Sequence, residues 1–244
     1  MVFAAAMLLV AGSCTSKGKG KDADKGFAVV ELFTSEGCSS CPPADALVAK
    51  IQKESEGKPV YILAYHVDYW NRLGWRDVFS SADYSNRQKQ YVLWMHSADG
   101  VYTPQIVVNG KTEFVGSEEK TLRNAIKASL ASDAGAQLSL SDIQTDGQKV
   151  RLHYQTGGNT QNTILQLAVV QRSAQTRVER GENGGRTLSH VQIVRALQSV
   201  KLKNAGGVTE ISIPKEVSTH GAELVALLQD SNTGVIKGAN KVDL

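Results

Sequence analysis

The chain has 244 residues, of which 41% are hydrophobic, so it is long enough for one large domain or two ordinary domains with a substantial core. Its formal net charge of +3 comes from 27 basic and 24 acidic side chains, and several of the lysines lie within the first 25 residues. Because no later stretch combines clustered basic residues with interleaved aromatic residues, the sequence argues against nucleic-acid binding.

An apolar segment opens the chain. Residues 1–14, MVFAAAMLLVAGSC, are too short to span a bilayer as a helix but have the length and composition of an export-signal core. The residues before Cys14 resemble the lipobox of bacterial lipoproteins, in which the cysteine becomes a lipid-modified N-terminus. No lysine or arginine precedes the run, and Ala11 replaces the commoner leucine, so secretion without lipid and a buried N-terminal helix stay open as alternatives. We predict a signal peptide with lipobox at 1–14, a membrane lipid anchor at Cys14 and a periplasmic or cell-envelope location.

A polar tract follows. Residues 15–26, TSKGKGKDADKG, contain mainly glycine and charged residues without apolar periodicity, and are predicted to form a flexible tether. The chain has three cysteines, an odd number for an exported protein. Assigning Cys14 to lipid leaves Cys38 and Cys41 as a pair.

A β-α-β unit is predicted next. Residues 27–33, FAVVELF, form a near-continuous apolar run of the kind found in a strand that is covered on both faces. Residues 43–55 begin with a proline and place apolar side chains on one stripe, which is typical of a helix. Residues 59–69 repeat the buried-strand pattern. A right-handed crossover would make the two strands parallel neighbours.

The rest of the first half predicts two more helices and a hairpin. Tyrosine, glutamine and methionine side chains repeat at helical spacing within residues 81–95. Asn109-Gly110 divides residues 103–116 into two short strands and is a strong hairpin signal. Residues 117–132 carry two glutamates in the first turn of a predicted helix.

The pattern changes after a Gly/Ala/Asp-rich stretch near residues 132–136. Short alternating segments follow, separated by turn residues at intervals of roughly ten, which predicts a small antiparallel sandwich. Residues 187–197, TLSHVQIVRAL, fit a strand or a helix equally well. We therefore predict an α/β fold in which an α/β domain at 27–133 precedes a smaller, β-rich, sandwich-like domain at 136–244.

Four segments carry a resemblance to a known family. The element order, the Cys-x-x-Cys after the first strand and the Thr-Pro before the hairpin resemble the thioredoxin fold. The wider strings are similar to the exported bacterial family called domain of unknown function 1223, and they are FTSEGCSSCPPAD (33–45), HVDYWNRLGW (66–75), YTPQIVVNG (102–110) and RGENGGRTLSHVQIVR (180–195). This resemblance implies that the domain at 27–133 is thioredoxin-like.

In a thioredoxin-like sheet the cysteine pair lies where a strand ends and a helix begins. Backbone N–H groups at a helix start favour a thiolate, so Cys38 would be the exposed nucleophile and Cys41 the resolving thiol. Glu36 opposes thiolate formation by its charge, and Pro42-Pro43 removes two N–H donors, so the direction of the net pKa shift stays open. Gly37, in place of the usual aromatic residue, would give the backbone of a partner closer access.

Two further positions are expected to assist exchange. Pro104 would be the cis proline opposite the dithiol, and Thr103 before it would offer backbone hydrogen bonds to a bound peptide. Glu31 interrupts an apolar strand seven residues before Cys38. Its carboxylate could lie beneath the dithiol, with a raised pKa, and accept the proton of Cys41, or it could be a strand-end residue bonded to a loop.

His66 and Trp70 follow the second parallel strand and are expected near the site. Trp70 could form an aromatic wall for an unfolded polypeptide or serve only in packing. His66 with Cys38 and Cys41 would supply three ligands suited to zinc or copper. An oxidising compartment favours the disulfide, and no fourth ligand is evident, so we expect no metal and no cofactor.

The second half offers weaker signals. Arg180, Glu182, Asn183 and Arg186 surround three glycines, which indicates either a hairpin turn with solvated charges or a contact surface facing the first domain. His190 is most simply an ordinary strand residue.

The sequence thus favours an exported thiol–disulfide oxidoreductase that exchanges disulfides with cysteine-containing exported proteins and with a membrane redox partner. One alternative is a non-catalytic thioredoxin-like binding module with a structural disulfide. Another is a copper or zinc carrier. The direction of exchange is left open.

Overall fold

The computed structural model describes residues 26–244; the predicted signal peptide, Cys14 and nearly all of the predicted tether lie outside this range. In chain order, its first half contains β1 (Ala28–Thr34), α1 (Pro42–Glu54), β2 (Val60–His66), a 3₁₀ helix (Asn71–Leu73), α2 (Ala82–Met95), β3 (Gln105–Val108), β4 (Thr112–Val115) and α3 (Glu119–Ala131). These elements confirm the strands and helices predicted up to residue 132. None of the helices described is long and apolar enough to cross a membrane.

The second half consists of strands. They are β5 (Ala136–Asp146), β6 (Lys149–Gly158), β7 (Thr163–Arg177), β8 (Thr187–Lys201), β9 (Gly206–Ser212), β10 (Ala222–Asp230) and β11 (Ile236–Asp243). The ambiguous segment 187–197 is therefore strand, as part of β8. Its alternating pattern of buried and partly exposed side chains is the period-two pattern of a sheet.

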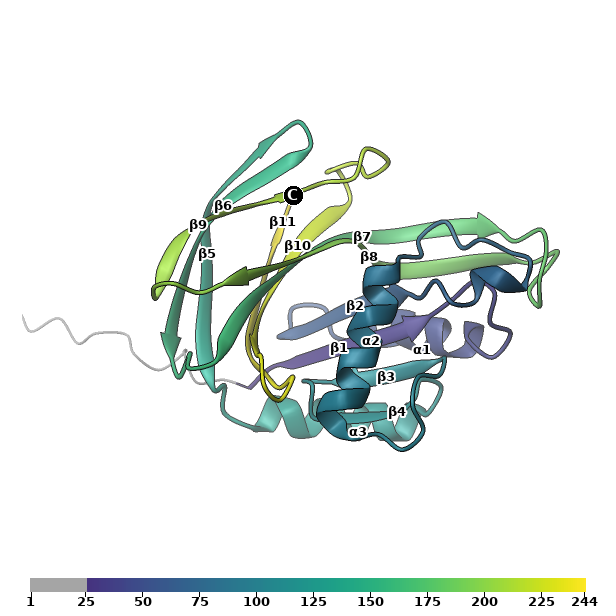
Figure 1. The fold of residues 1–244 in the computed structure, drawn as a ribbon, viewed down its shortest axis with the longest axis horizontal. Coiled ribbons are helices and arrows are strands. Elements are labelled where there is room, and N and C mark those ends of the chain that lie inside the picture. Colours follow the sequence, from purple (N-terminus) through teal and green to yellow (C-terminus); the bar gives the residue numbers. More distant parts are fainter. Residues whose placement is uncertain (1–25) are drawn as a thin grey trace, which may run out of the picture.

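Within residues 26–244, eight strands form one mixed sheet in the order β11-β10-β7-β8-β2-β1-β3-β4 (Figure 1). β1 and β2 are parallel, as the β-α-β prediction requires, and β3 pairs antiparallel with β1. β8 is bridged to β2 at one position, where Ala64 lies opposite Ile193. This sheet crosses the expected boundary at residues 133–136, so the strands of the second half extend the sheet of the first half.

Helices cover both faces of the first half of this sheet. One apolar cluster joins α1 and α3 to side chains of β1, β2 and β3, such as Val30 and Leu32. A second cluster, on the opposite face, joins Tyr84 and Tyr91 of α2 to Phe33 and to strands of both halves. Alternate residues of β1 therefore face α1 and α2 in turn.

A second layer covers the other end of the large sheet. β5, β6 and β9 form a three-stranded antiparallel sheet. Its apolar face packs against β7 and β10, with Leu152 and Tyr154 contributing from one sheet and Leu167 and Leu224 from the other. The strands of the second half thus pack as two layers, as in a sandwich.

The predicted hairpin at Asn109-Gly110 is confirmed. Both residues have positive φ, 51° and 64°, which a two-residue hairpin turn of this type requires. The Asn109 side chain also accepts a hydrogen bond from Val29 N at 2.6 Å and donates one to Phe27 O at 3.0 Å. The turn therefore fixes the start of β1.

A buried ion pair connects β1 to α2. Arg87 Nη2 lies 2.6 Å from Glu31 Oε1, and both side chains are essentially excluded from solvent. Tyr91 donates its hydroxyl proton to the other Glu31 oxygen, and Arg87 Nη1 donates to Gln229 Oε1 of β10 at 3.1 Å. Because every charged atom has a partner, the pair holds β1, α2 and β10 together.

We predict that Glu31→Gln lowers the free energy of unfolding by about 3–5 kcal/mol, because it leaves the Arg87 charge buried without a counter-charge. Urea denaturation measures this loss. Glu119→Gln serves as the control, since Glu119 pairs with Lys50 at 2.8 Å on the exposed surface and should cost much less. Equal losses in the two variants would contradict the structural role of the buried pair.

Candidate functional site

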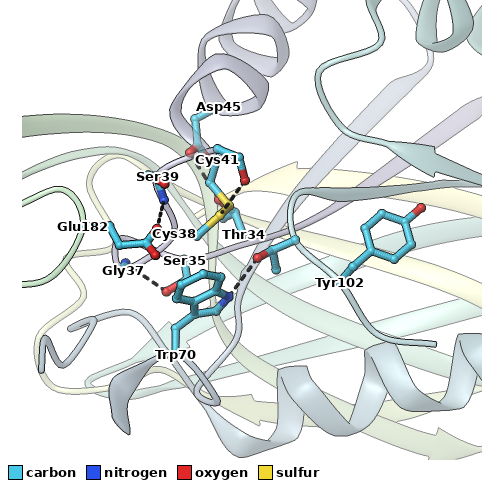
Figure 2. Close-up of a disulfide and its surroundings, with 12 residues drawn as sticks. Thr34, Ser35, Gly37, Cys38, Ser39, Cys41, Asp45, Trp70, Tyr102 and Glu182 are labelled. Carbon is cyan, nitrogen blue, oxygen red and sulfur yellow. Dashed lines mark hydrogen bonds between the residues drawn. A yellow bond between two sulfur atoms is a disulfide. The ribbon is translucent and has the colours of Figure 1, made fainter. Parts of the chain in front are cut away.

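The cysteine pair lies between the end of β1 and the start of α1. Cys38 and Cys41 form a disulfide, and Cys41 is the residue that precedes the first turn of α1 (Figure 2). The intervening backbone forms tight turns, with Cys38 N donating to Ser35 O and Cys41 N donating to Cys38 O, both at 3.2 Å. Pro42 and Pro43 form the first helical residues, where a missing N–H costs little, so they do not delay the helix.

Both cysteines are fully buried. This corrects the expectation that Cys38 is an exposed nucleophile. The hairpin tip formed by residues 178–186 between β7 and β8 contacts the loop that carries Cys38. Because Cys38 has no exposed surface, the reactive sulfur of a partner would reach it only after surrounding residues move.

The hairpin tip bonds directly to the backbone around Cys38. Asn183 Nδ2 donates to Glu36 O and to Cys38 O, both at 2.9 Å, and Asn183 is itself fully buried. Glu182 Oε2 accepts from Ser39 N at 3.0 Å (Figure 2). Hydrogen bonds from Ser39 lower the pKa of Glu182. The segment is both a hairpin turn, with Arg180, Glu182 and Arg186 exposed, and a contact surface through Asn183.

Three of the residues expected to bind a partner lie together beside the disulfide. A Cβ at Gly37 would lie 3.4 Å from Trp70 Cβ, so Trp70 packs over the glycine. Trp70 Nε1 donates to Thr103 Oγ1 at 2.9 Å. Trp70 thus links the cysteine loop to the loop before β3, and Gly37 is covered by this indole in the closed structure.

The Thr103-Pro104 peptide bond is cis, as predicted. Pro104 lies close to the first turn of α1, because a Cβ built at Gly116 would approach both Pro104 Cβ, at 3.0 Å, and Ala44 Cβ, at 3.1 Å. The proline and the start of the cysteine-bearing helix therefore meet at one place. Gly116 is needed there because any side chain would separate them.

Glu31 does not lie beneath the disulfide. Successive side chains of β1 point to opposite faces, and Leu32 faces α1 whereas Glu31 faces α2. Its carboxylate is occupied by Arg87 and Tyr91 on the face away from α1. The expected role of Glu31 as proton acceptor for Cys41 is corrected accordingly, and different acids are near the pair.

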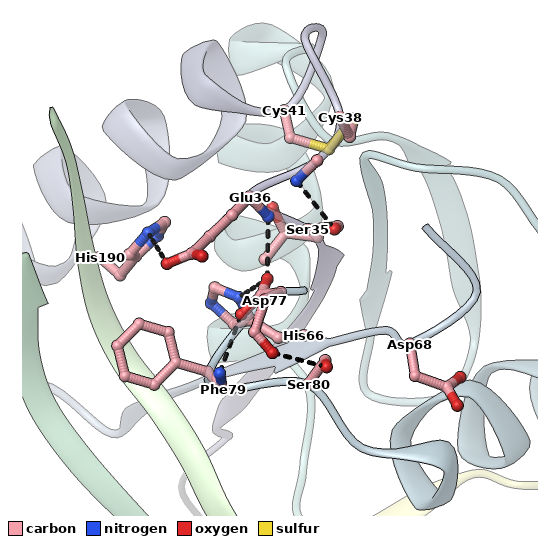
Figure 3. A network of polar contacts seen from close by, with 12 residues as sticks. Ser35, Glu36, Cys38, Cys41, His66, Asp68, Asp77, Phe79, Ser80 and His190 are labelled. Atoms are coloured by element: carbon pink, nitrogen blue, oxygen red, sulfur yellow. Dashed lines mark hydrogen bonds and ion pairs between the residues drawn. A yellow bond between two sulfur atoms is a disulfide. The ribbon is translucent and has the colours of Figure 1, made fainter. Parts of the chain in front are cut away.

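The acids near the pair are Glu36 and Asp45. They belong to a buried polar network behind the cysteine loop, part of which is drawn in Figure 3. Glu36 Oε1 lies 3.5 Å from His190 Nε2, and Asp45 Oδ1 lies 4.0 Å from His190 Nδ1. His66 Nδ1 lies 2.7 Å from Asp77 Oδ2, the oxygen that also accepts from Glu36 N. The rings of His66 and His190 are 4.8 Å apart, so the contacts form one cluster.

Electrostatics hold His190 in its charged form. Burial by itself lowers the pKa of a histidine, but the nearby carboxylates of Asp45 and Glu36 outweigh it and raise the pKa of His190 to about 9. Burial likewise works to raise the pKa of Asp77, and the contacts with His66 more than offset it. The network therefore contains a protonated imidazole between two carboxylates at neutral pH.

The proposed metal ligands are not arranged for a metal. His66 is fully buried and its Nδ1 is engaged with Asp77. Throughout residues 26–244, no group of three or more His, Cys, Asp or Glu side chains could hold a metal ion. The structure places His66 in the polar network instead, where it supports the loop that carries Asp77.

Sequence reasoning missed Asp45 and Asp77, took His190 for an ordinary strand residue, and identified Asn183 only as part of a possible contact surface. Asp45 could have been found, because it stands four residues after Cys41 and returns to the same face of the helix. Placing Asn183 and His190 required knowing that β8 lies beside β2, and placing Asp77 required knowing that its loop folds back onto His66. The string RGENGGRTLSH contains Asn183 and His190, but only the tertiary structure shows that it lies beside the cysteine loop.

Comparisons with known proteins agree with this architecture. Residues 29–229 match the family described as "Protein of unknown function (DUF1223)", and the chain belongs to that family. It is similar to the crystal structure of protein AGR_C_4864 from Agrobacterium tumefaciens, with 30% identity, a TM-score of 0.65 and coverage of 88% of this chain and 93% of that one.

A second solved structure shares the fold at lower identity. HBP35 of Porphyromonas gingivalis is 14% identical, with a TM-score of 0.59 and coverage of 90% of this chain and 76% of that chain. No match to a curated protein was found. The family resemblance expected from the sequence is thus confirmed. Neither the family description nor the names of these two structures state an activity.

We predict that His190 makes stability depend on pH. Because its pKa is about 9 in the folded protein against 6.5 without the fold, its contribution is complete below about pH 6.5 and is lost as the pH rises through 9. The difference in unfolding free energy between the wild type and His190→Gln should therefore shrink by on the order of 3 kcal/mol between pH 6 and pH 10. Urea denaturation at both values checks this, and a constant difference would rule out a protonated His190.

Proposed function

We propose that the protein is an exported thiol–disulfide oxidoreductase that exchanges disulfides through Cys38 and Cys41. The observation that carries the proposal is the position of this disulfide, at the start of α1 and beside the loop that holds Pro104. The strand order β2-β1-β3-β4, with helices on both faces, supports a thioredoxin-like reading of the first half. In that reading Cys38 is attacked first, and Cys41 is the thiol that leaves and later resolves.

Exchange requires the hairpin tip to move. The two hydrogen bonds of Asn183 go to backbone carbonyls, and each is worth about 0.5–1.5 kcal/mol net. A partner polypeptide can supply equivalent N–H donors to the same carbonyls. Displacement of the tip by a partner is therefore energetically accessible, and the closed form protects the disulfide from other thiols.

The expected partners follow from the sequence. The apolar segment 1–14 and Cys14 support export and a lipid anchor, which would hold the site at a membrane surface. Cysteine-containing exported proteins are the proposed substrates. A membrane redox protein is proposed to return the pair to its working oxidation state.

A second candidate function is a binding module in which the disulfide is purely structural. The complete burial of both cysteines favours it, because a structural disulfide needs no access. In that case the hairpin tip would be a permanent part of the core and the polar network would serve stability alone.

We predict that equilibration with glutathione gives a reduction potential between about −270 and −120 mV, the range of exchange-active proteins. The fraction of reduced protein is measured by quenching and mass spectrometry after thiol alkylation. A potential below about −300 mV would favour the structural disulfide, since such a bond resists the glutathione pool.

We predict that Asn183→Ala raises the rate of disulfide reduction by dithiothreitol about 10- to 100-fold, because it removes two hydrogen bonds that hold the tip closed. The rate is followed by alkylation of the released thiols. Asn204→Ala, at an exposed loop position, is the matched control and should leave the rate unchanged. An unchanged rate in Asn183→Ala would mean that the tip does not control access.

A further inference from the structure

A buried carboxylate lies one helical turn after Cys41. Asp45 belongs to the first turn of α1, and its backbone N–H donates to Cys41 O at 3.1 Å. Helical side chains lean toward the N-terminus of the helix, so the Asp45 carboxylate extends back over the turn that carries Cys41 (Figure 2). It is nine-tenths buried and accepts a hydrogen bond from Thr34 Oγ1 at 3.2 Å.

His190 lies behind this carboxylate and is sealed from solvent. The titratable groups that face it are Asp45 of α1, Glu36 of the cysteine loop and His66 of β2, whose own partner is Asp77. Neither ring nitrogen of His190 has a hydrogen-bond partner among the described residues, and neither does Glu36 Oε1. The imidazole is thus held by charge and by packing, with its N–H groups uncommitted.

Resting on the proposed function, we propose that Asp45 and His190 form the acid–base pair that delivers a proton to Cys41 during exchange. A partner thiolate attacks Cys38 Sγ, the bond between the two sulfurs breaks, and its electron pair leaves on Cys41 Sγ. His190 Nδ1 gives its proton to the Asp45 carboxylate, which passes it to that sulfur and is left as a carboxylate again. The products are a mixed disulfide on Cys38, a Cys41 thiol and a neutral His190, and the reverse sequence removes the proton when Cys41 attacks.

The surroundings favour this route over the other acids. A Cys41 thiolate next to the Asp45 carboxylate would place two negative charges together in a buried site, which drives protonation of the sulfur. Glu31 is on the other face of the sheet, paired with Arg87. His190 carries a proton at neutral pH, because its pKa is raised to about 9. The 4.0 Å between His190 Nδ1 and Asp45 Oδ1 is about 1 Å longer than a hydrogen bond, so a small side-chain shift connects them.

The test is the pH dependence of disulfide reduction by dithiothreitol, with each rate constant divided by the concentration of dithiothreitol thiolate at that pH. For the wild type this normalised rate should be constant from pH 6 to 8 and fall as the pH rises through about 9, as His190 loses its proton. Asp45→Asn keeps the shape of the side chain and should lower the normalised rate at pH 7 by about 100-fold or more and abolish its fall. His190→Gln should do the same.

His153→Gln is the matched control, since His153 is an exposed histidine that lies 3.5 Å from Asp142 in the three-stranded sheet, and it should keep the wild-type profile. Should His190→Gln fail to fold, Asp45→Asn decides alone. A flat wild-type profile, or an Asp45→Asn profile equal to that of the wild type, overturns the acid–base pair while exchange through Cys38 and Cys41 still stands. A wild-type disulfide that dithiothreitol cannot reduce at any pH overturns the exchange function itself, and this inference with it.

Discussion

The contact between β8 and β2 is the constraint on which the site depends. Ile193 lies opposite Ala64, and the ring of His190 lies 4.8 Å from that of His66, so the start of β8 reaches the edge where β1 and β2 end. The hairpin tip at 178–186 then lies over the cysteine loop, and His190 reaches Glu36 and Asp45. The second half of the chain thereby contributes side chains to the surroundings of the disulfide.

Burial and reactivity are balanced against each other at this disulfide. Both sulfurs are removed from solvent, which would suit an inert structural disulfide. The tip contacts the cysteine loop through hydrogen bonds, however: Asn183 donates two to backbone carbonyls, and Glu182 accepts one from Ser39 N. Such contacts can be exchanged for those of an incoming polypeptide at small net cost, whereas an apolar plug would have to be hydrated.

The protein contains two kinds of buried charge, one in the Glu31–Arg87 pair and one in the polar network around His190. Glu31 and Arg87 satisfy each other fully and stabilise the junction of β1, α2 and β10. His190 is different, because it sits between two carboxylates at distances of 3.5 and 4.0 Å without a hydrogen bond to either. In the Glu31–Arg87 pair every charged atom has a hydrogen-bond partner. The His190 proton is not held in this way and can move, so only His190 is suited to proton transfer.

The sequence by itself determined the local elements and the cysteine pair, and its resemblance to the thioredoxin fold led to the expectation of the cis proline. Apolar periodicity and turn residues act over a few residues, so β1, α1, β2 and the Asn109-Gly110 hairpin could be predicted from neighbours in the chain. Only the tertiary structure decided that Glu31 faces away from α1, since a shift of one residue in a strand exchanges its two faces. It also decided that Asn183 and His190 cover the cysteine loop, because pairing between strands more than a hundred residues apart leaves no local pattern in either strand.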